Sequence, residues 1–97
     1  MIKERYEEVC DSLLESLQPG FGGQSNPVLL EKVRGLAHEA ETIGKIPYIR
    51  EKARSLVGWV EIACSLRRHK PWGLERVEHF AYKDAYRLRH AYPDGEN

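Results

Sequence analysis

Basic and aromatic side chains are interleaved through the C-terminal half of this chain, and this pattern is its clearest sign of chemistry. Cations beside aromatic rings suit the acidic surface of another protein, and they also suit the phosphates and unstacked bases of a nucleic acid. Arg, Trp and Tyr are the residues that most often dominate binding energy at protein interfaces. The residues that we expect to bind a partner are Arg67, Arg68, Lys70, Trp72, Arg76, Lys83, Tyr86 and Arg87.

Three interpretations of this basic half are open. The simplest is a solvated basic face that Glu75, Glu78 and Asp84 partly neutralise. The functional interpretation that we prefer is a regulator, inhibitor or adaptor that binds an acidic protein surface. The alternative is nucleic-acid binding by the same residues, but a helix-turn-helix arrangement fits poorly. Its recognition helix would open with Leu74 and Glu75, whereas base contacts usually come from the first residues of that helix.

Other kinds of chemistry have little support in the sequence. Cys10 and Cys64 fall on apolar helix faces, where a thiol is unreactive, and 54 positions separate them, unlike the clustered ligands of a zinc site. The segment Gly20–Gly23 has Ser25 where a dinucleotide-binding fingerprint needs its third glycine, and no strand precedes it. We therefore expect no enzyme activity, no metal and no cofactor.

The spacing of apolar residues predicts four helical segments and no β-strand. The first helix is expected over 1–18. Glycines and prolines in 19–27 cannot continue it, so we expect a loose linker there, and the first helix can fold onto its own chain or exchange with a second copy. Asn26 and Pro27 have the residue types of an N-cap and a first helical position, and Gly44 is the expected C-cap.

The helix expected over about 47–69 has the widest apolar face in the chain. Its apolar residues cover about half of the circumference, so it must contact more than one neighbour and is predicted to be central. Gly58 in its middle costs about 1 kcal/mol relative to alanine. Either a close helix crossing explains this glycine or it has no special role. A last helix is expected over 74–92, before Pro93, and residues 93–97 are expected to form a tail.

These elements predict an all-α fold, a small antiparallel bundle of three to four helices with its helical core at 27–92. A chain of 97 residues is expected to form one domain, 1–97. At this size stability is marginal, so a homodimer would help, although the sequence does not decide between monomer and dimer.

The charge of the chain is zero overall but unevenly distributed. Residues 1–44 carry a balance of −4, and residues 45–97 carry +4. The two halves can therefore neutralise each other within one molecule or across a dimer, or the basic half can be kept for an acidic partner. No stretch is apolar for long enough to span a membrane and the start of the chain is charged, so we expect a cytoplasmic protein.

Overall fold

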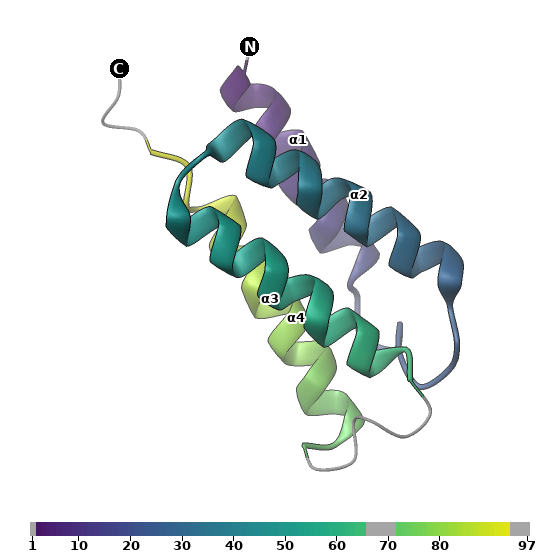
Figure 1. Cartoon of the computed structure of the whole chain (residues 1–97). Coiled ribbons are helices and arrows are strands. Elements are labelled where there is room, and N and C mark those ends of the chain that lie inside the picture. Colours follow the sequence, from purple (N-terminus) through teal and green to yellow (C-terminus); the bar gives the residue numbers. More distant parts are fainter. Residues whose placement is uncertain (1, 66–71, 94–97) are drawn as a thin grey trace.

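The computed structural model describes residues 2–65 and 72–93. It contains four helices in chain order, which are α1 (Ile2–Ser16), α2 (Pro27–Gly44), α3 (Pro47–Ala63) and α4 (Leu74–Arg89). Successive helices run in opposite directions, and the start of α1 and the end of α4 lie at the same end of the bundle (Figure 1). The predicted all-α antiparallel bundle is therefore confirmed, with four helices.

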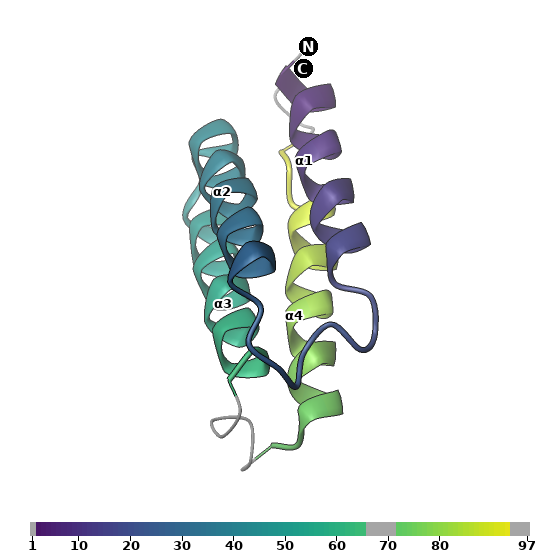
Figure 2. The same ribbon diagram turned by 90° about the vertical axis from the view of Figure 1, so that its right-hand side faces the viewer.

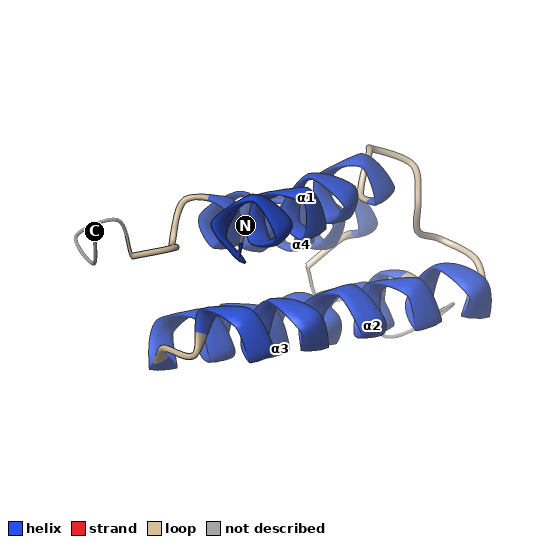
Figure 3. Cartoon of the chain, turned by 90° about the horizontal axis from the view of Figure 1, so that it is seen from above, coloured by secondary structure: helices blue, strands red, loops and turns tan. Residues whose placement is uncertain are grey.

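The helices form two layers, with α1 and α4 in one and α2 and α3 in the other (Figures 2 and 3). Contacts run around a ring, from α1 to α2, α2 to α3, α3 to α4 and α4 back to α1. The most extensive of these contacts are those of α3 with α4 and with α2. This agrees with the wide apolar face that predicted a central position for this helix.

The core lies between the two layers and every helix contributes to it. Small residues on α3 and α4, such as Ala53, Ala81 and Ala85, are fully buried and let these two helices approach closely. Burying one large aliphatic side chain stabilises the fold by about 1.5–3 kcal/mol, so a core of this size can hold a short chain together. The largest fully buried side chains are Tyr6, Val9, Leu13, Leu17, Val33, Ile49, Leu56, Val60, Val77 and Leu88.

The predicted start of α2 is confirmed, but its predicted end is wrong. The side-chain oxygen of Asn26 accepts the backbone N–H of Leu29 at 3.1 Å, as an N-cap should. Gly44 remains helical, and the left-handed C-cap is Lys45, with a φ of 63°. A Cβ atom on Gly44 would overlap the side chain of Ile49. The glycine is therefore required for the close packing of α2 on α3 and not for the cap.

Three helix ends fall short of the predicted boundaries. Helix α1 was predicted to reach residue 18 and ends at Ser16, and α4 was predicted to reach residue 92 and ends at Arg89. The largest difference is in α3, which was predicted to reach residue 69 and ends at Ala63. The carbonyl of Ala63 accepts the N–H of Gly23 at 2.7 Å, so a distant segment occupies the position of the next helical hydrogen bond.

The segment between α1 and α2 is fixed to the bundle and is not the loose linker that its composition predicted. Glu78 of α4 is buried, and its two carboxylate oxygens accept the N–H groups of Gly20 at 3.0 Å and Gly22 at 2.8 Å. Phe21 between them packs against the core. A Cβ on Gly22 would approach the Ala63 carbonyl to 2.8 Å, so only glycine fits there. We call Glu78 and the segment 19–26 the glycine-loop clamp.

No helix within residues 2–65 and 72–93 combines the length and the apolar character that crossing a bilayer requires.

Candidate functional site

The structure describes five of the eight residues that were predicted to bind a partner. Arg67, Arg68 and Lys70 lie outside the described residues. Arg76, Lys83 and Arg87 follow one another along α4 at seven- and four-residue spacings, which places them on one side of the helix, and all three are exposed. Trp72 lies just before α4 and is 41% exposed.

An aromatic cluster stands at the N-terminal end of this basic stripe. The ring of Trp72 meets that of Trp59 edge to face, with centroids 5.4 Å apart and planes at 88°. Trp59 also contacts Phe80 of α4, with centroids 4.7 Å apart. Such geometries add about 0.5–1.5 kcal/mol per pair beyond the area that they bury. The cluster therefore holds the exposed Trp72 in place.

From Arg76 onward, the exposed charges of α4 are cationic because the acidic residues there are buried, whereas Glu75 in the first turn is exposed. Between Arg76 and His90 the only acids are Glu78 and Asp84, and both are buried. Glu78 belongs to the glycine-loop clamp. Asp84 lies 3.6 Å from Arg87 through one carboxylate oxygen, and its other oxygen, Oδ2, has no hydrogen-bond partner in the described structure.

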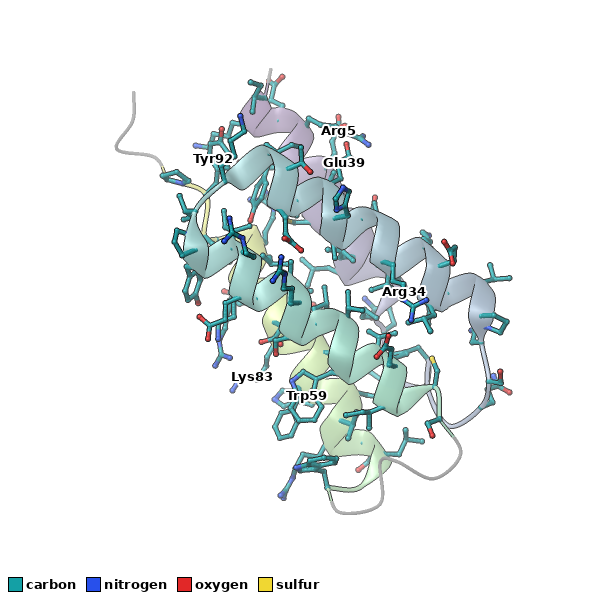
Figure 4. All side chains as sticks on the ribbon, in the orientation of Figure 1. Arg5, Arg34, Glu39, Trp59, Lys83 and Tyr92 are labelled. Carbon is teal, nitrogen blue, oxygen red and sulfur yellow. The ribbon has the colours of Figure 1, made fainter. Side chains whose placement is uncertain are left out.

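Helix α3 extends the surface with a parallel stripe. Tyr48, Lys52 and Trp59 are spaced so that they share one side of α3, and the Nζ atom of Lys52 lies 5.5 Å from the centre of the Tyr48 ring. Figure 4 shows Trp59 and Lys83 along the same flank of the α3 and α4 pair. We call this surface the α3–α4 face and define it by Tyr48, Lys52, Trp59, Trp72, Arg76, Phe80, Lys83 and Arg87.

Sequence reasoning missed half of this face. Trp59 and Phe80 are partly buried at the edges of the apolar stripes of α3 and α4. Their position at the edge, next to the basic stripe, was the signal that could have identified them. Tyr86 belongs to a neighbouring side of α4, where it is 55% exposed and its ring lies 4.5 Å from that of His90.

Elsewhere the charges of the two halves neutralise each other within the molecule. Arg89 of α4 pairs with Asp11 at 3.0 Å and Glu7 at 3.5 Å on α1. Arg5 and Glu39 join α1 to α2 through a 2.6 Å ion pair (Figure 4). In the described part of the chain, neither Arg76 nor Lys83 has a carboxylate within ion-pair distance. Of the described cations without an ion pair, Lys52, Arg76 and Lys83 lie on the α3–α4 face, and Lys32, Lys45 and Arg50 lie elsewhere on the surface.

A hollow of about 490 Å³ lies on a different side of α4, against the C-terminal end of α1. Glu75, Glu78 and His79 line it together with Tyr82 and Leu17. Its best-placed acid, Glu78, already accepts two backbone N–H groups in the clamp. This carboxylate therefore has a structural role, and we do not assign acid–base chemistry to it.

The cysteines and the metal-binding residue types give no centre for chemistry in the described residues. Cys10 and Cys64 are both free, and burial raises the pKa of Cys10 to about 11 and also raises the pKa of Cys64. Both thiols are thus protonated near neutral pH and weak nucleophiles. No three His, Cys, Asp or Glu side chains of residues 2–65 and 72–93 are grouped as a metal ion would need.

Comparisons with family models, with curated proteins and with solved structures each found no match to this chain.

Proposed function

We propose that this protein is a small non-enzymatic regulator, inhibitor or adaptor that binds an acidic surface of another protein through the α3–α4 face. One observation carries the proposal. An exposed tryptophan, supported by two further aromatic rings, stands beside Arg76 and Lys83, which have no ion-pair partner in the described residues, and the acids of α4 beyond Arg76 are buried. Aromatic anchors surrounded by charged groups are typical of the centre and rim of protein interfaces.

The packing of the aromatic rings favours a protein partner over a nucleic acid. Nucleobases bind by stacking on open ring faces. In this face, Trp59 contacts both Trp72 and Phe80, so much of the ring surface is already used within the cluster. What Trp72 still exposes, 41% of its surface, suits contact with an apolar side chain of a protein partner. The cations would nevertheless suit phosphates, so nucleic acid is the alternative that the experiments must separate.

We further propose that the protein acts in the cytoplasm. The support is chemical, because its two cysteines are both free thiols, and free thiols are the usual state in a reducing compartment.

Photo-crosslinking tests the proposal directly. A benzophenone side chain at Tyr86, exposed beside the face, is compared with the same group at Val28 of α2, which is 80% exposed. We expect position 86, and not 28, to capture one acidic protein that mass spectrometry identifies. A homodimer would appear as capture of this chain by itself. Equal capture at the two positions would contradict the proposal.

The purified captured partner then allows a test of mechanism. Trp72→Ala should abolish its binding, because the anchor is lost, while salt should affect only the charged rim. Labelled DNA and RNA are titrated in parallel at about 50 and about 200 mM salt, where binding to phosphates would fall by orders of magnitude. Tight nucleic-acid binding at low salt that Trp72→Ala hardly changes would favour the alternative and overturn our proposal.

A further inference from the structure

We propose that the segment bound by the α3–α4 face is an amphipathic α-helix that carries one apolar anchor and acidic residues about one and two turns from it. This inference rests on the proposed function and adds the chemistry and the secondary structure of the partner.

The arrangement of groups along the face gives the pattern of the partner. The aromatic cluster around Phe80 is the apolar part. Lys83 and Arg87 follow it three and seven residues along α4, and Arg76 precedes it by four. At about 1.5 Å per residue, these cations lie about 4.5 and 10.5 Å beyond Phe80 and about 6 Å before it. A partner helix that lies along α4 would place its acidic residues opposite these cations if they stand three or four and seven residues from its apolar anchor.

Helix α3 adds a second row of side chains to the face. Lys52 lies seven residues before Trp59, so it adds a cation on the α3 side, at the end away from the aromatic cluster. Because α3 and α4 run in opposite directions, a ligand lying along the face would meet Lys52 and Arg87 at one end, and the rings of Trp59 and Phe80 with Arg76 at the other. Ridges of side chains on neighbouring helices are surfaces on which a further helix packs well.

The backbone of the face explains why the partner should be helical. Both α3 and α4 satisfy their central N–H and C=O groups internally, so the face presents side chains and no free backbone edge. An extended peptide would lose hydrogen bonds to water there without replacing them, at a cost for each group. A helix satisfies its own backbone, and its apolar stripe can lie on the face without that cost.

Charge decides between acidic and basic helices. The face carries Lys52, Arg76, Lys83 and Arg87, and the one carboxylate on the same side of α4, Asp84, is buried. A basic helix would be repelled along its whole length, whereas an acidic one gains several rim ion pairs and is steered toward the face.

Two stapled helical peptides of identical composition test the inference. Both carry one leucine anchor and three glutamates. In the patterned peptide the glutamates stand four residues before the leucine and three and seven after it, and in the inverted peptide they occupy the opposite side of the helix. The two tryptophans of the chain both lie in the face, so intrinsic fluorescence reports binding without a label. We expect the patterned peptide to bind at least about tenfold more tightly, a difference of about 1.4 kcal/mol.

Charge-reversed variants connect this binding to the face. Lys83→Glu should weaken binding of the patterned peptide by about tenfold. Lys32→Glu, an exposed lysine on α2, should leave it unchanged. Equal binding of the two stapled peptides would overturn the inference, as would tighter binding of a proline-rich extended peptide with the same residues. Neither result would touch the proposed function, which fails if the crosslinking at position 86 shows no preference or if tight nucleic-acid binding survives Trp72→Ala.

Discussion

At the scale of single residues, the two cysteines differ in their access to solvent. Cys10 is fully buried between α1 and its neighbours, whereas Cys64 is only partly buried at the end of α3. A thiol must be both reachable and ionised to react. In the native protein at pH 8 we therefore expect a thiol reagent to modify Cys64 on the order of tenfold faster than Cys10. Peptide mapping after timed labelling measures both rates, and equal rates would contradict the burial of Cys10.

The Cys10 thiol makes the free energy of unfolding depend on pH in the alkaline range. Burial raises the pKa of Cys10 from 9.0 to about 11, and burial also raises the pKa of Tyr6, whose hydroxyl donates a 2.6 Å hydrogen bond to the Leu88 carbonyl. Each group loses its proton more easily in the unfolded chain, so unfolding is favoured as pH rises.

We therefore expect the contribution of the protonated Cys10 to the free energy of unfolding to be fully present below pH 9 and to be lost progressively as the pH rises through about 11. Urea denaturation at a series of pH values measures this. Cys10→Ala should reduce the slope between these values, and an unchanged slope would show that this thiol does not contribute.

Glu78 is the residue whose loss should affect the largest part of the local structure. Its carboxylate accepts two N–H groups of the glycine-rich segment, and hydrogen bonds to a charged group contribute about 1.5–3 kcal/mol each. Glu78→Gln keeps one acceptor and leaves the other N–H group unpaired. We expect it to lower the free energy of unfolding by about 2 kcal/mol and to accelerate hydrogen exchange at Gly20 and Gly22.

The matched control for this variant is Glu75→Gln, an exposed carboxylate one turn earlier on α4. It should change stability by less than about 0.5 kcal/mol. Equal effects of the two variants would mean that the clamp contributes nothing specific.

At the scale of elements, Gly44 of α2 and Gly58 of α3 have opposite roles. A Cβ on Gly58 of α3 would meet nothing within 4 Å, so no close crossing requires this glycine, contrary to one of our two explanations for it. Gly58→Ala should stabilise the protein by about 1 kcal/mol. Gly44→Ala should destabilise it, because the added Cβ would overlap Ile49. Thermal unfolding of both variants checks the contrast, and a loss of stability in Gly58→Ala would contradict it.

The helices themselves were predictable because local signals and the apolar pattern agree. Apolar residues at three- and four-residue steps identified all four, and Asn26 with Pro27 located the start of α2 to the residue. The end of α3 was not predictable from local sequence. The helix ends where the carbonyl of Ala63 accepts the N–H of Gly23, forty residues away, and neither segment has a sequence pattern that predicts this contact.

The candidate site was predictable only in part, for a related reason. The basic stripe of Arg76, Lys83 and Arg87 follows from helical spacing alone. The contribution of Trp59 depends on which flank of α3 meets α4, and that is fixed by the packing of the whole ring. The same packing buries Glu78 and Asp84, which one interpretation of the sequence expected to neutralise the basic face.

At the scale of the whole molecule, the fold separates two uses of charge. Ion pairs such as Arg89 with Asp11 and Arg5 with Glu39 lie between helices, where exposed pairs stabilise by at most about 1 kcal/mol each. The cations of the α3–α4 face have little part in this neutralisation. A basic surface therefore remains on a molecule of zero net charge, and under our proposal this surface binds an acidic partner.

The most direct test of the account is the affinity of the captured partner for two charge-reversed variants, measured by titration calorimetry. Lys83→Glu changes the α3–α4 face, and Arg50→Glu changes an exposed site on α3 outside the face. We expect at least about a tenfold loss of affinity for Lys83→Glu and less than about a twofold change for Arg50→Glu. Equal losses, or no loss for Lys83→Glu, would contradict the assignment of this face as the binding surface.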